Sequence, residues 1–382
     1  MMSFHLLLAV LLFLFIGWRA VHPVKLSWGR KTVLYALTAL ATGKFLIVRL
    51  LGGEMFFAPQ LPRWFLILSS LLYTSAVIFF LLLVLELLPV CLLALLDYWR
   101  KSHWGESFRR VRGRVHLVML VLSVLTASYG IYCGLRLPAV KEISVVTKIS
   151  GETARTIRIA AVSDIHVDRI HGRKQTLRLV EKVNALKPDL ILLLGDYVDG
   201  RLHTHREDLE PLKGLSAPLG VYGIPGNHEY YSGYREWMDY LSSLGIQMLL
   251  NRHVVKPGFV LAGVTDSAGR RSGEELPSVS QALYRAPEEL PVLLMAHNPK
   301  IMADAVRHQV DLQLSGHTHG GMVPLLSRVV AASNNGRVRG FYREGKTVLY
   351  ITSGAGIWNG FPVRLGIPSE IVLLHWKLEP GH

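Results

Sequence analysis

The stretch Ser315-Gly316-His317-Thr318-His319-Gly320-Gly321 follows a short apolar run, Val310–Leu314, that is typical of a buried strand ending in a turn. Two histidines separated by one residue on a glycine-flanked loop can turn both imidazoles into one cleft. Glycine lets the backbone approach closely and adopt dihedral angles that other residues avoid. A histidine pair on a surface turn often has no function. Four stretches upstream have the same design, however, and together they favour a functional site.

Short apolar runs alternate with amphipathic segments after Pro138, and this alternation predicts an α/β fold. Five predicted strands end just before polar residues in turns: Ile157–Val162 before Asp164 and His166, Leu190–Leu194 before Asp196 and Asp199, Val221–Ile224 before Asn227 and His228, Val292–Ala296 before His297 and Asn298, and Leu312–Leu314 before His317 and His319. Because ligand sites on α/β sheets gather beyond the carboxyl ends of strands, we expect these side chains to converge.

The converging side chains offer oxygen and imidazole ligands without sulfur: Asp164, His166, Asp196, Asn227, His297, His317 and His319. Such a set suits manganese, iron or zinc rather than a thiolate-bound structural zinc. Seven ligands are too many for one ion that must leave a position open for substrate. They predict two ions, roughly 3.5–4 Å apart, that bind the attacking and leaving oxygens of a phosphoryl group. Taken singly, Asp164 or Asn227 could be a turn residue and Asp196 a helix cap.

The five stretches resemble the sequence blocks of the calcineurin-like metallophosphoesterases. The blocks are Asp164-Ile165-His166, Gly195-Asp196-x-x-Asp199, Gly226-Asn227-His228-Glu229, His297 and Gly316-His317-Thr318-His319, and the resemblance covers about residues 155–378. It implies a four-layer αββα sandwich with two divalent ions, manganese first and iron or zinc as alternatives. One ion would bind Asp164, His166, Asp196 and His319, and the other would bind Asp196, Asn227, His297 and His317.

The resemblance also assigns the catalytic residues. His228 would protonate the leaving oxygen or stabilise the phosphoryl charge, with Asp199 orienting it, while a metal-bound hydroxide attacks. Within the family the chain is most similar to the bacterial membrane-associated branch related to YkuE and YaeI. That branch commonly has glutamine after the double glycine, where this chain has Met322. Met322 cannot supply an amide, so we expect any polar contact made by that glutamine to be missing.

Three further features leave alternatives open. Arg364 could bind phosphate through its guanidinium group or be a solvated arginine. Asn298 could position substrate or turn the chain. The mostly apolar segment 322–332 is expected to be buried core, and the alternative is a lip that touches a lipid bilayer.

Four apolar segments precede this part of the chain: Phe4–Trp18, Val33–Leu51, Phe65–Leu96 and Val115–Leu135. Each approaches or exceeds the roughly 20 residues that cross a bilayer. They predict a four-helix transmembrane region in residues 1–137, followed by the catalytic domain in residues 138–382. The first segment lacks a preceding basic residue and a cleavage site, so a retained helix is favoured over a signal peptide. The third contains Glu86 and Pro89, and we expect it to tilt or kink.

Charge is distributed unevenly along the chain. Residues 1–137 hold 14 basic and 4 acidic residues, whereas residues 138–382 hold 28 and 24. The basic excess therefore flanks apolar segments, and a nucleic-acid partner is not favoured. The basic residues lie between the first and second and between the third and fourth segments, so the positive-inside rule places the catalytic domain outside the cytoplasm. One helix fewer would reverse this orientation. Lys44 and Glu86 lie within apolar segments and could pair across helices or extend to the interface.

The expected function is hydrolysis of a phosphate ester or pyrophosphate beside the cell membrane. The short connection after Leu135 keeps the catalytic domain near the bilayer and favours a lipid-linked substrate, so membrane lipids are expected partners. The alternatives are a tethered hydrolase of soluble nucleotides or sugar phosphates, a nuclease, and a non-catalytic scaffold or sensor. Cys91 and Cys133 both lie in apolar segments, so neither a disulfide nor a cysteine metal site is possible in residues 138–382.

Overall fold

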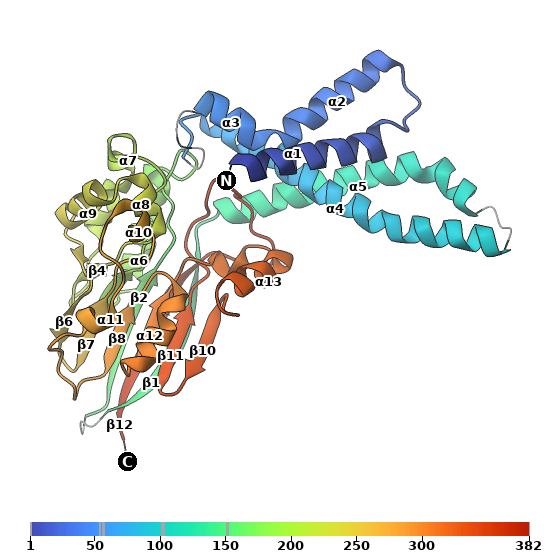
Figure 1. Ribbon diagram of the computed structural model, residues 1–382. Helices are drawn as coiled ribbons and strands as arrows, with labels where there is room; N and C mark the ends of the chain where they lie inside the picture. Colours follow the sequence, from blue (N-terminus) through green and yellow to red (C-terminus); the bar gives the residue numbers. More distant parts are fainter. Residues whose placement is uncertain (1, 53–54, 56–57, 101–103, 150–152, 382) are drawn as a thin grey trace. The chain divides into compact units, whose positions relative to one another are not determined.

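The computed structural model describes residues 2–52, 55, 58–100, 104–149 and 153–381 (Figure 1). The chain forms two compact units. The helical unit comprises Met1–Tyr132 with Phe361–Val363, and the catalytic unit comprises Cys133–Gly360 with Arg364–His382. The first strand begins at Ala139, next to the start predicted for the catalytic domain.

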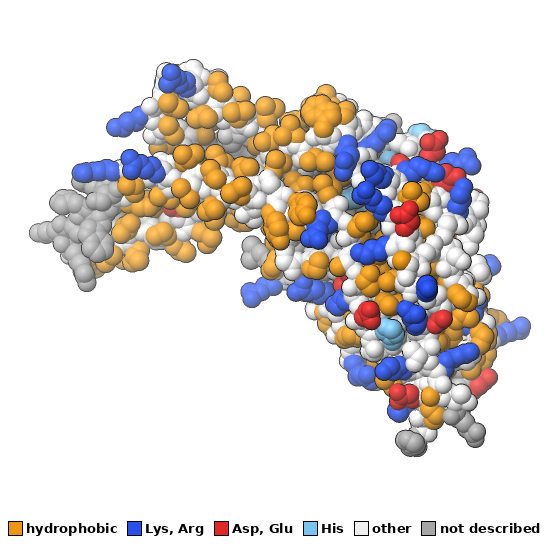
Figure 2. Space-filling view, turned by 180° about the vertical axis from the view of Figure 1, so that it is seen from behind, with side chains coloured by type: hydrophobic (Ala, Val, Ile, Leu, Met, Phe, Trp, Pro, Cys, Tyr) orange, Lys and Arg blue, Asp and Glu red, His pale blue; other side chains and the backbone are white. Residues whose placement is uncertain are grey.

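Helices make up the first unit. They are α1 (Met2–Ile16), the π-helix η1 (Gly17–Val21), α2 (Trp28–Thr42), α3 (Lys44–Gly52), α4 (Arg63–Arg100) and α5 (Trp104–Leu135), the last of which continues into the catalytic unit. Ile16 of α1 packs against Phe79 and Leu83 of α4. Hydrophobic side chains also cover much of the surface of these helices (Figure 2), as expected of segments that face lipid.

Among the described residues, two helices are long and apolar enough to cross a membrane, Arg63–Trp99 and Arg110–Leu135. A third span results only if α2 and α3, which are bent by 70°, are taken as one broken span. The predicted second segment, Val33–Leu51, is thus interrupted at Gly43, a residue that costs about 1 kcal/mol in a helix. The predicted count of four spanning helices is not confirmed. The orientation that depended on this count stays a prediction.

Glu86 is a buried carboxylate of the helical unit. Its oxygens lie 3.0 Å from Arg19 Nη2, 3.1 Å from His116 Nε2 and 3.6 Å from Arg112 Nε. Glu86 therefore pairs across helices and does not extend to the interface. Lys44 is buried as well, with its ammonium group 5.3 Å from the centroid of the Phe45 ring.

Two six-stranded sheets form the centre of the catalytic unit. The first has the order β1-β12-β2-β3-β4-β5 and the second β10-β11-β9-β8-β7-β6. The strands are β1 (Ala139–Ile149), β2 (Arg155–Val162), β3 (Leu190–Leu193), β4 (Val221–Gly223), β5 (Gln247–Met248), β6 (Arg252–Lys256), β7 (Phe259–Gly263), β8 (Val292–Met295), β9 (Leu312–Ser315), β10 (Gly340–Glu344), β11 (Thr347–Ile351) and β12 (Glu370–Pro380). Strands β2, β3 and β4 pair in parallel, as do β7, β8 and β9.

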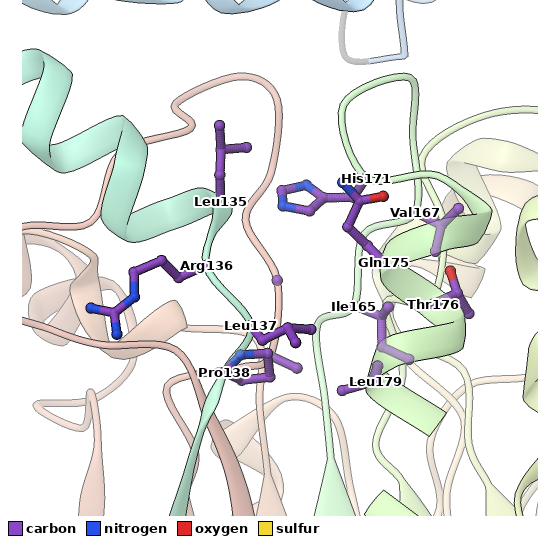
Figure 3. Close-up of a pocket in the computed structure, with 12 residues that line it drawn as sticks. Leu135, Arg136, Leu137, Pro138, Ile165, Val167, His171, Gln175, Thr176 and Leu179 are labelled. Carbon is purple, nitrogen blue, oxygen red and sulfur yellow. The ribbon is translucent and has the colours of Figure 1, made fainter. Parts of the chain in front are cut away.

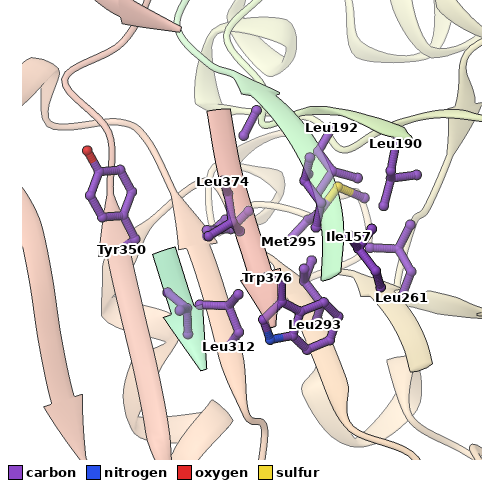
Figure 4. Packing of buried hydrophobic residues seen from close by; sticks show 14 of the residues in the cluster. Ile157, Leu190, Leu192, Leu261, Leu293, Met295, Leu312, Tyr350, Leu374 and Trp376 are labelled. Atoms are coloured by element: carbon purple, nitrogen blue, oxygen red, sulfur yellow. The ribbon is translucent and has the colours of Figure 1, made fainter. Parts of the chain in front are cut away.

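Side chains alternate between two cores along the strands, as the period of a strand requires. Leu190 and Leu192 of β3 face the second sheet, where they join Leu293 and Leu312 in the core between the sheets (Figure 4). Ile191 faces the other way, into a core shared with the helices α6 (Arg173–Ala185) and α9 (Tyr234–Ser243). The second sheet has its own outer core with the helices α11 (Val279–Ala282) and α12 (Met302–Arg307). The predicted sandwich with two sheets is confirmed, with helices on its outer faces.

The remaining helical segments are short. They are α7 (Leu202–Leu209), η2 (Glu210–Gly214), α8 (Asn227–Ser232), α10 (Gly269–Ser272), η3 (Pro299–Ile301), η4 (His319–Gly321) and α13 (Pro324–Ser333). Helix α13 covers most of the segment that was expected to be buried core. Its Leu326 and Val329 are 38% and 63% exposed, so that expectation is wrong. An apolar composition alone does not determine which surface a helix covers.

A small cavity lies where the connection after α5 meets α6 (Figure 3). Its lining is mainly apolar and includes Leu137 and Pro138 from the connection and Thr176 and Leu179 from α6. Lys182 Nζ donates a hydrogen bond to the carbonyl oxygen of Pro138 over 2.6 Å. The connection is therefore fixed to the catalytic unit from Pro138 onward.

Candidate metal centre

The seven predicted ligands follow the carboxyl ends of five strands. Asp164 and His166 follow β2, Asp196 follows β3, Asn227 follows β4, His297 follows β8, and His317 and His319 follow β9. Because the strands within each sheet are parallel here, their carboxyl ends share an edge, and the side chains come together as expected.

Five of these residues adopt the left-handed region of backbone space: Asp164, His166, Asp196, His317 and His319, with φ between 48° and 70°. Only a few per cent of non-glycine residues do so, and each instance costs free energy that the surrounding structure must offset.

Glycines permit the loops to approach one another. A Cβ on Gly226 would lie 2.2 Å from Asp196 Oδ1, and one on Gly316 would lie 1.9 Å from Ser163 Oγ. Any side chain at either position would separate the loops.

The first ligand group consists of Asp164, His166 and His319. The Nε2 atoms of His166 and His319 lie 3.0 Å apart, and His319 Nε2 lies 3.5 Å from Asp164 Oδ1. Burial, together with the neighbouring His166 and Arg364, holds the pKa of His319 well below its usual range. The ring is therefore neutral, with a lone pair available to a cation.

The second group contains Asp196, His297 and His317, and the oxygen of Asn227 lies 2.7 Å from His317 Nδ1. His297 Nδ1 donates to the carbonyl oxygen of Leu194 over 2.7 Å. This bond leaves the lone pair of neutral His297 Nε2 pointing at Asp196 Oδ2, 3.1 Å away. Two acceptors at this distance require a proton or a metal ion between them. Burial alone would lower the pKa of His297, but the Asp196 carboxylate raises it to about 10.

Asp196 connects the two groups. Its Oδ2 lies 3.1 Å from His297 Nε2 and 3.7 Å from His166 Nε2. Burial would raise the pKa of this carboxyl, but the facing imidazoles of His297 and His228 hold it well below its usual range. A carboxylate in this position can serve ions on both sides. Asp196 thus occupies the place predicted for a shared ligand.

His228 and Asp199 lie beside the first group. His228 Nδ1 is hydrogen-bonded to Asp199 Oδ1, as the predicted orienting role requires. Burial would lower the pKa of His228, but the carboxylates of Asp199 and Asp196 raise it to about 9, so the ring is protonated at neutral pH. Asp199 Oδ2 also contacts His166 Nδ1, at 3.2 Å, and this contact was not predicted from the sequence. One buried carboxylate therefore orients a predicted ligand and the predicted acid.

Glu229 is a positioning residue that the sequence analysis did not single out. It is fully buried, and its carboxylate accepts hydrogen bonds from the backbone N–H groups of Asp196, Tyr197 and Gly226 over 3.0, 2.7 and 2.7 Å. It holds together the loops that carry Asp196 and Asn227. A glutamate three residues after Gly226 at a helix start is the pattern of a capping box, which could have indicated this role.

The two predicted substrate-binding residues have other partners in the structure. Arg364 is 1% exposed, and its Nη2 donates to the carbonyl oxygens of Ser353 and Gly356, each over 2.7 Å. The alternative of a solvated arginine is therefore wrong. Asn298 Oδ1 accepts a hydrogen bond from the backbone N–H of Lys300 and caps η3. Arg364 Nη2 also lies 3.4 Å from Nδ1 of the predicted ligand His319. Both substrate-binding assignments stay predictions.

Two aromatic side chains that were not predicted lie beside His228. The ring centroids of Tyr231 and Trp358 are 5.5 Å and 6.5 Å from that of His228. They give this side of the centre an apolar wall. Residues 357–358 read from sequence only as part of a tail rich in glycine and proline.

Comparison with known proteins gives a consistent result. A family model described as calcineurin-like phosphoesterase matches residues 157–321. A protein of Danio rerio named "Transmembrane protein with metallophosphoesterase domain" is 32% identical over 375 residues, which cover 93% of this chain and 82% of that protein. This alignment includes most of the helical unit.

Bacterial relatives match mainly the catalytic unit. An "Uncharacterized metallophosphoesterase" of Helicobacter pylori strain J99 is 35% identical over 248 residues, which cover 64% of this chain and 65% of the relative. This chain thus spans just under two thirds of that relative's length. YkuE of Bacillus subtilis, also named a metallophosphoesterase, is 28% identical over 58% of this chain and 79% of its own length.

Solved structures match only remotely. A dimetal phosphatase from Danio rerio is 14% identical, with a TM-score of 0.33, over 52% of this chain and 88% of that chain. A 5'-nucleotidase precursor from Thermus thermophilus is 15% identical, with a TM-score of 0.37, over 58% and 55%. At this distance neither match informs on the substrate.

Proposed function

This chain belongs to the calcineurin-like metallophosphoesterases, and we propose that it is a membrane-anchored phosphoesterase with two divalent metal ions. Hydrolysis of a phosphate ester by a metal-dependent enzyme is what the family does. Anchoring is supported by the two candidate spans and by the relative named a transmembrane protein. The observation that carries the proposal is the position of Asp196 Oδ2 between His166 and His297.

The residues fit a pair of cations. Asp164, His166 and His319 would hold one ion, His297, His317 and Asn227 the other, and Asp196 would be shared. The facing lone pairs of His297 and Asp196 are the chemistry that a cation satisfies. Two such ions would supply electrophilic stabilisation of phosphate oxygens and would lower the pKa of the attacking water. Manganese is our first candidate because the ligands are oxygen and nitrogen atoms, with iron and zinc as alternatives.

His228 would hold and deliver the proton in this reaction. The Asp199 carboxylate fixes its Nδ1, so Nε2 is the ring atom that would serve a leaving oxygen. With a pKa raised to about 9, the ring carries a proton at neutral pH and can donate it or stabilise phosphoryl charge. Tyr231 and Trp358 would exclude water beside this proton.

We propose a phosphate ester or pyrophosphate at a lipid surface as the substrate class. Only three residues separate the end of α5 at Leu135 from the start of β1 at Ala139. This short connection favours a substrate presented by the bilayer over a soluble nucleotide, which needs no such proximity. The nuclease alternative would show cleavage of nucleic acid with a steep dependence on salt.

The test is metal-dependent hydrolysis of bis-p-nitrophenyl phosphate by the full-length protein in detergent. The control is the Asn227→Ala, His228→Ala double variant, prepared in the same way. We expect manganese to restore activity to chelator-treated protein but not to the control. Equal rates for both proteins would contradict the enzyme and leave the scaffold alternative.

A further inference from the structure

Helix α13 exposes apolar side chains that the folded catalytic unit does not cover. Leu326 and Val329 are 38% and 63% exposed, and Pro324 and Ala332 are exposed as well. The helix has ten residues, so at 1.5 Å per residue it is about 15 Å long and too short to cross a bilayer. A short helix of this kind can instead lie in the plane of a membrane interface.

Helix α13 is attached rigidly to the loop that carries the double histidine. It begins three residues after Gly321, where a Cβ would lie 2.6 Å from the Cα of Ser327. Ser327 Oγ donates to the carbonyl oxygen of Gly320 over 3.3 Å. The exposed side chains therefore have a fixed position relative to His317 and His319.

Positive charge is concentrated around this helix. Residues 322–346 hold five basic residues and one acidic residue: Arg328, Arg337, Arg339, Arg343 and Lys346 against Glu344. The rest of residues 138–382 holds 23 basic and 23 acidic residues, so this segment accounts for the whole net positive charge of that part of the chain. Arg328, Arg339 and Arg343 are exposed.

Two of the five basic side chains already have acidic partners. Arg337 pairs with Glu344 at 2.9 Å and Lys346 with Asp311 at 3.2 Å. Arg339 lies beside Gly320, because its Cδ would be 3.6 Å from a Cβ built there. An exposed arginine thus lies on α13 itself and another beside the double-histidine loop.

We propose that α13, with Arg328 and Arg339, docks on the surface of a bilayer that contains anionic lipids. Apolar side chains flanked by arginine suit the boundary between acyl chains and acidic headgroups, where each basic residue contributes about 1 kcal/mol. A membrane is favoured over a protein partner because a candidate span ends at Leu135 and the chain is fixed to the catalytic unit from Pro138. The three residues 136–138 span at most about 10 Å when extended, so β1 begins close to the end of that helix.

This inference rests on the proposed membrane anchoring and says how anchoring would serve the reaction. A docked α13 brings the double-histidine loop to the headgroup layer, where a lipid-linked phosphate would lie. The substrate would then reach the centre without leaving the bilayer.

The test uses the full-length chain with Cys91→Ser and Cys133→Ser, so that a single added cysteine can carry a nitroxide spin label. Val329→Cys places the label on the exposed face of α13. Tyr284→Cys places it on another exposed apolar position, 68% accessible, as the matched control. Both proteins are reconstituted in phosphatidylcholine vesicles with and without phosphatidylglycerol. Collisions of the label with oxygen and with a water-soluble nickel chelate report its depth.

We expect the label at 329 to be accessible to oxygen and protected from nickel, more so with phosphatidylglycerol, while the label at 284 stays accessible to nickel. Arg328→Glu should remove the effect of phosphatidylglycerol. Equal nickel access at both positions would overturn the proposal. So would a label at 329 protected from both reagents, because a protein surface would then cover it. The spectrum of that label would then show whether the covering surface is a second copy of this chain. In that case it would show dipolar broadening that disappears when the labelled protein is diluted with unlabelled protein.

Hydrolysis of bis-p-nitrophenyl phosphate by the same preparations separates the two proposals. An active enzyme with a water-exposed α13 would contradict docking alone. An inactive protein with a lipid-protected label would contradict the proposed reaction alone.

Discussion

In the helical unit, Glu86 lies against Arg19 and His116, and in the catalytic unit Asp196 lies against His297 and His166. Both carboxylates are buried and both have nitrogen atoms as neighbours. The neighbours of Glu86 include guanidinium groups, which are always charged and carry only donors. The neighbours of Asp196 are imidazoles, which offer lone pairs once they lose a proton.

The imidazoles beside Asp196 differ from the groups around Glu86 because one nitrogen of each ring already has a partner. His297 Nδ1 is bound to a carbonyl oxygen and His166 Nδ1 to Asp199, so His297 Nε2 faces Asp196 and His166 Nε2 faces His319 Nε2. The Asp196 cluster therefore needs protons or cations from outside the chain. The Glu86 cluster has its positive charge within the chain. Burial of a carboxylate does not by itself indicate a metal site. The chemistry of the neighbouring side chains determines whether a cation is needed.

The strongest test of this contrast is Asp196→Ala. We expect loss of metal-dependent hydrolysis to background and loss of bound metal, because the atom shared by both ligand groups is removed. Metal content by mass spectrometry and hydrolysis of bis-p-nitrophenyl phosphate measure this. The surface variant Asp304→Ala should match the unmodified chain in both. Full metal content in Asp196→Ala would mean that Asp196 binds no metal.

His228→Ala should separate the proton donor from the ligands. General acid catalysis contributes about 10²–10⁴-fold, so kcat should fall by that factor while the metal content stays unchanged. His203→Ala, a substitution on the exposed face of α7, is the control. A variant that keeps its rate, or one that loses its metal, would contradict the assigned role.

Glu86→Ala should destabilise the helical unit without changing the metal centre. Removing one partner of a buried ion pair costs about 3–5 kcal/mol, because Arg19 is left buried, and Arg112 half-buried, without a counter-charge. Reversible unfolding in mixed detergent micelles measures the free energy, and metal content is measured in parallel. An additional Arg19→Met substitution should recover part of the loss. Unchanged unfolding would show that the pair contributes no stability.

Glu229→Gln should weaken metal binding by about 10–100-fold, the usual effect of a group that holds ligands in place. Glutamine keeps the size of the side chain but offers one acceptor oxygen where the carboxylate accepts three backbone N–H groups. Calorimetric titration with manganese measures the affinity. Glu236→Gln, on α9, is the control. Identical affinities would show that the two loops hold their positions without Glu229.

The smallest expected effect is the dependence of metal affinity on pH. The pKa of His297 is raised to about 10 without metal, so a proton occupies the ring at neutral pH and must leave when a metal binds. Metal affinity should therefore rise about tenfold per pH unit for this one proton, as long as the pH stays below 10. Titrations in buffers of different ionisation enthalpy count the protons released. An affinity independent of pH between 6 and 8 would contradict this picture.

The catalytic unit was predicted better than the helical unit for a physical reason. Buried parallel strands are short apolar runs, and the polar residues that end them mark the site, so Asp164, Asp196 and His297 could be placed from sequence alone. The bend at Gly43 depends on packing that hydropathy does not record. The position of α13 depends on which surfaces remain uncovered after folding. Glu229 binds the backbone N–H groups of Asp196 and Tyr197, which are distant in sequence, and only its bond to Gly226 belongs to the local capping pattern. The carbonyl groups that bury Arg364 are likewise not marked by any residue type in the sequence.

Strand β12 lies between β1 and β2, so residues 370–380 complete the sheet that carries Asp164 and Asp196. During synthesis the ribosome makes the helical unit and the other strands of the two sheets before it makes this strand. Pairing between segments so distant in sequence is slow, and β1 and β2 expose unpaired edges until it occurs. The sheet that carries Asp164 and Asp196 is therefore completed only after the helical unit has been made.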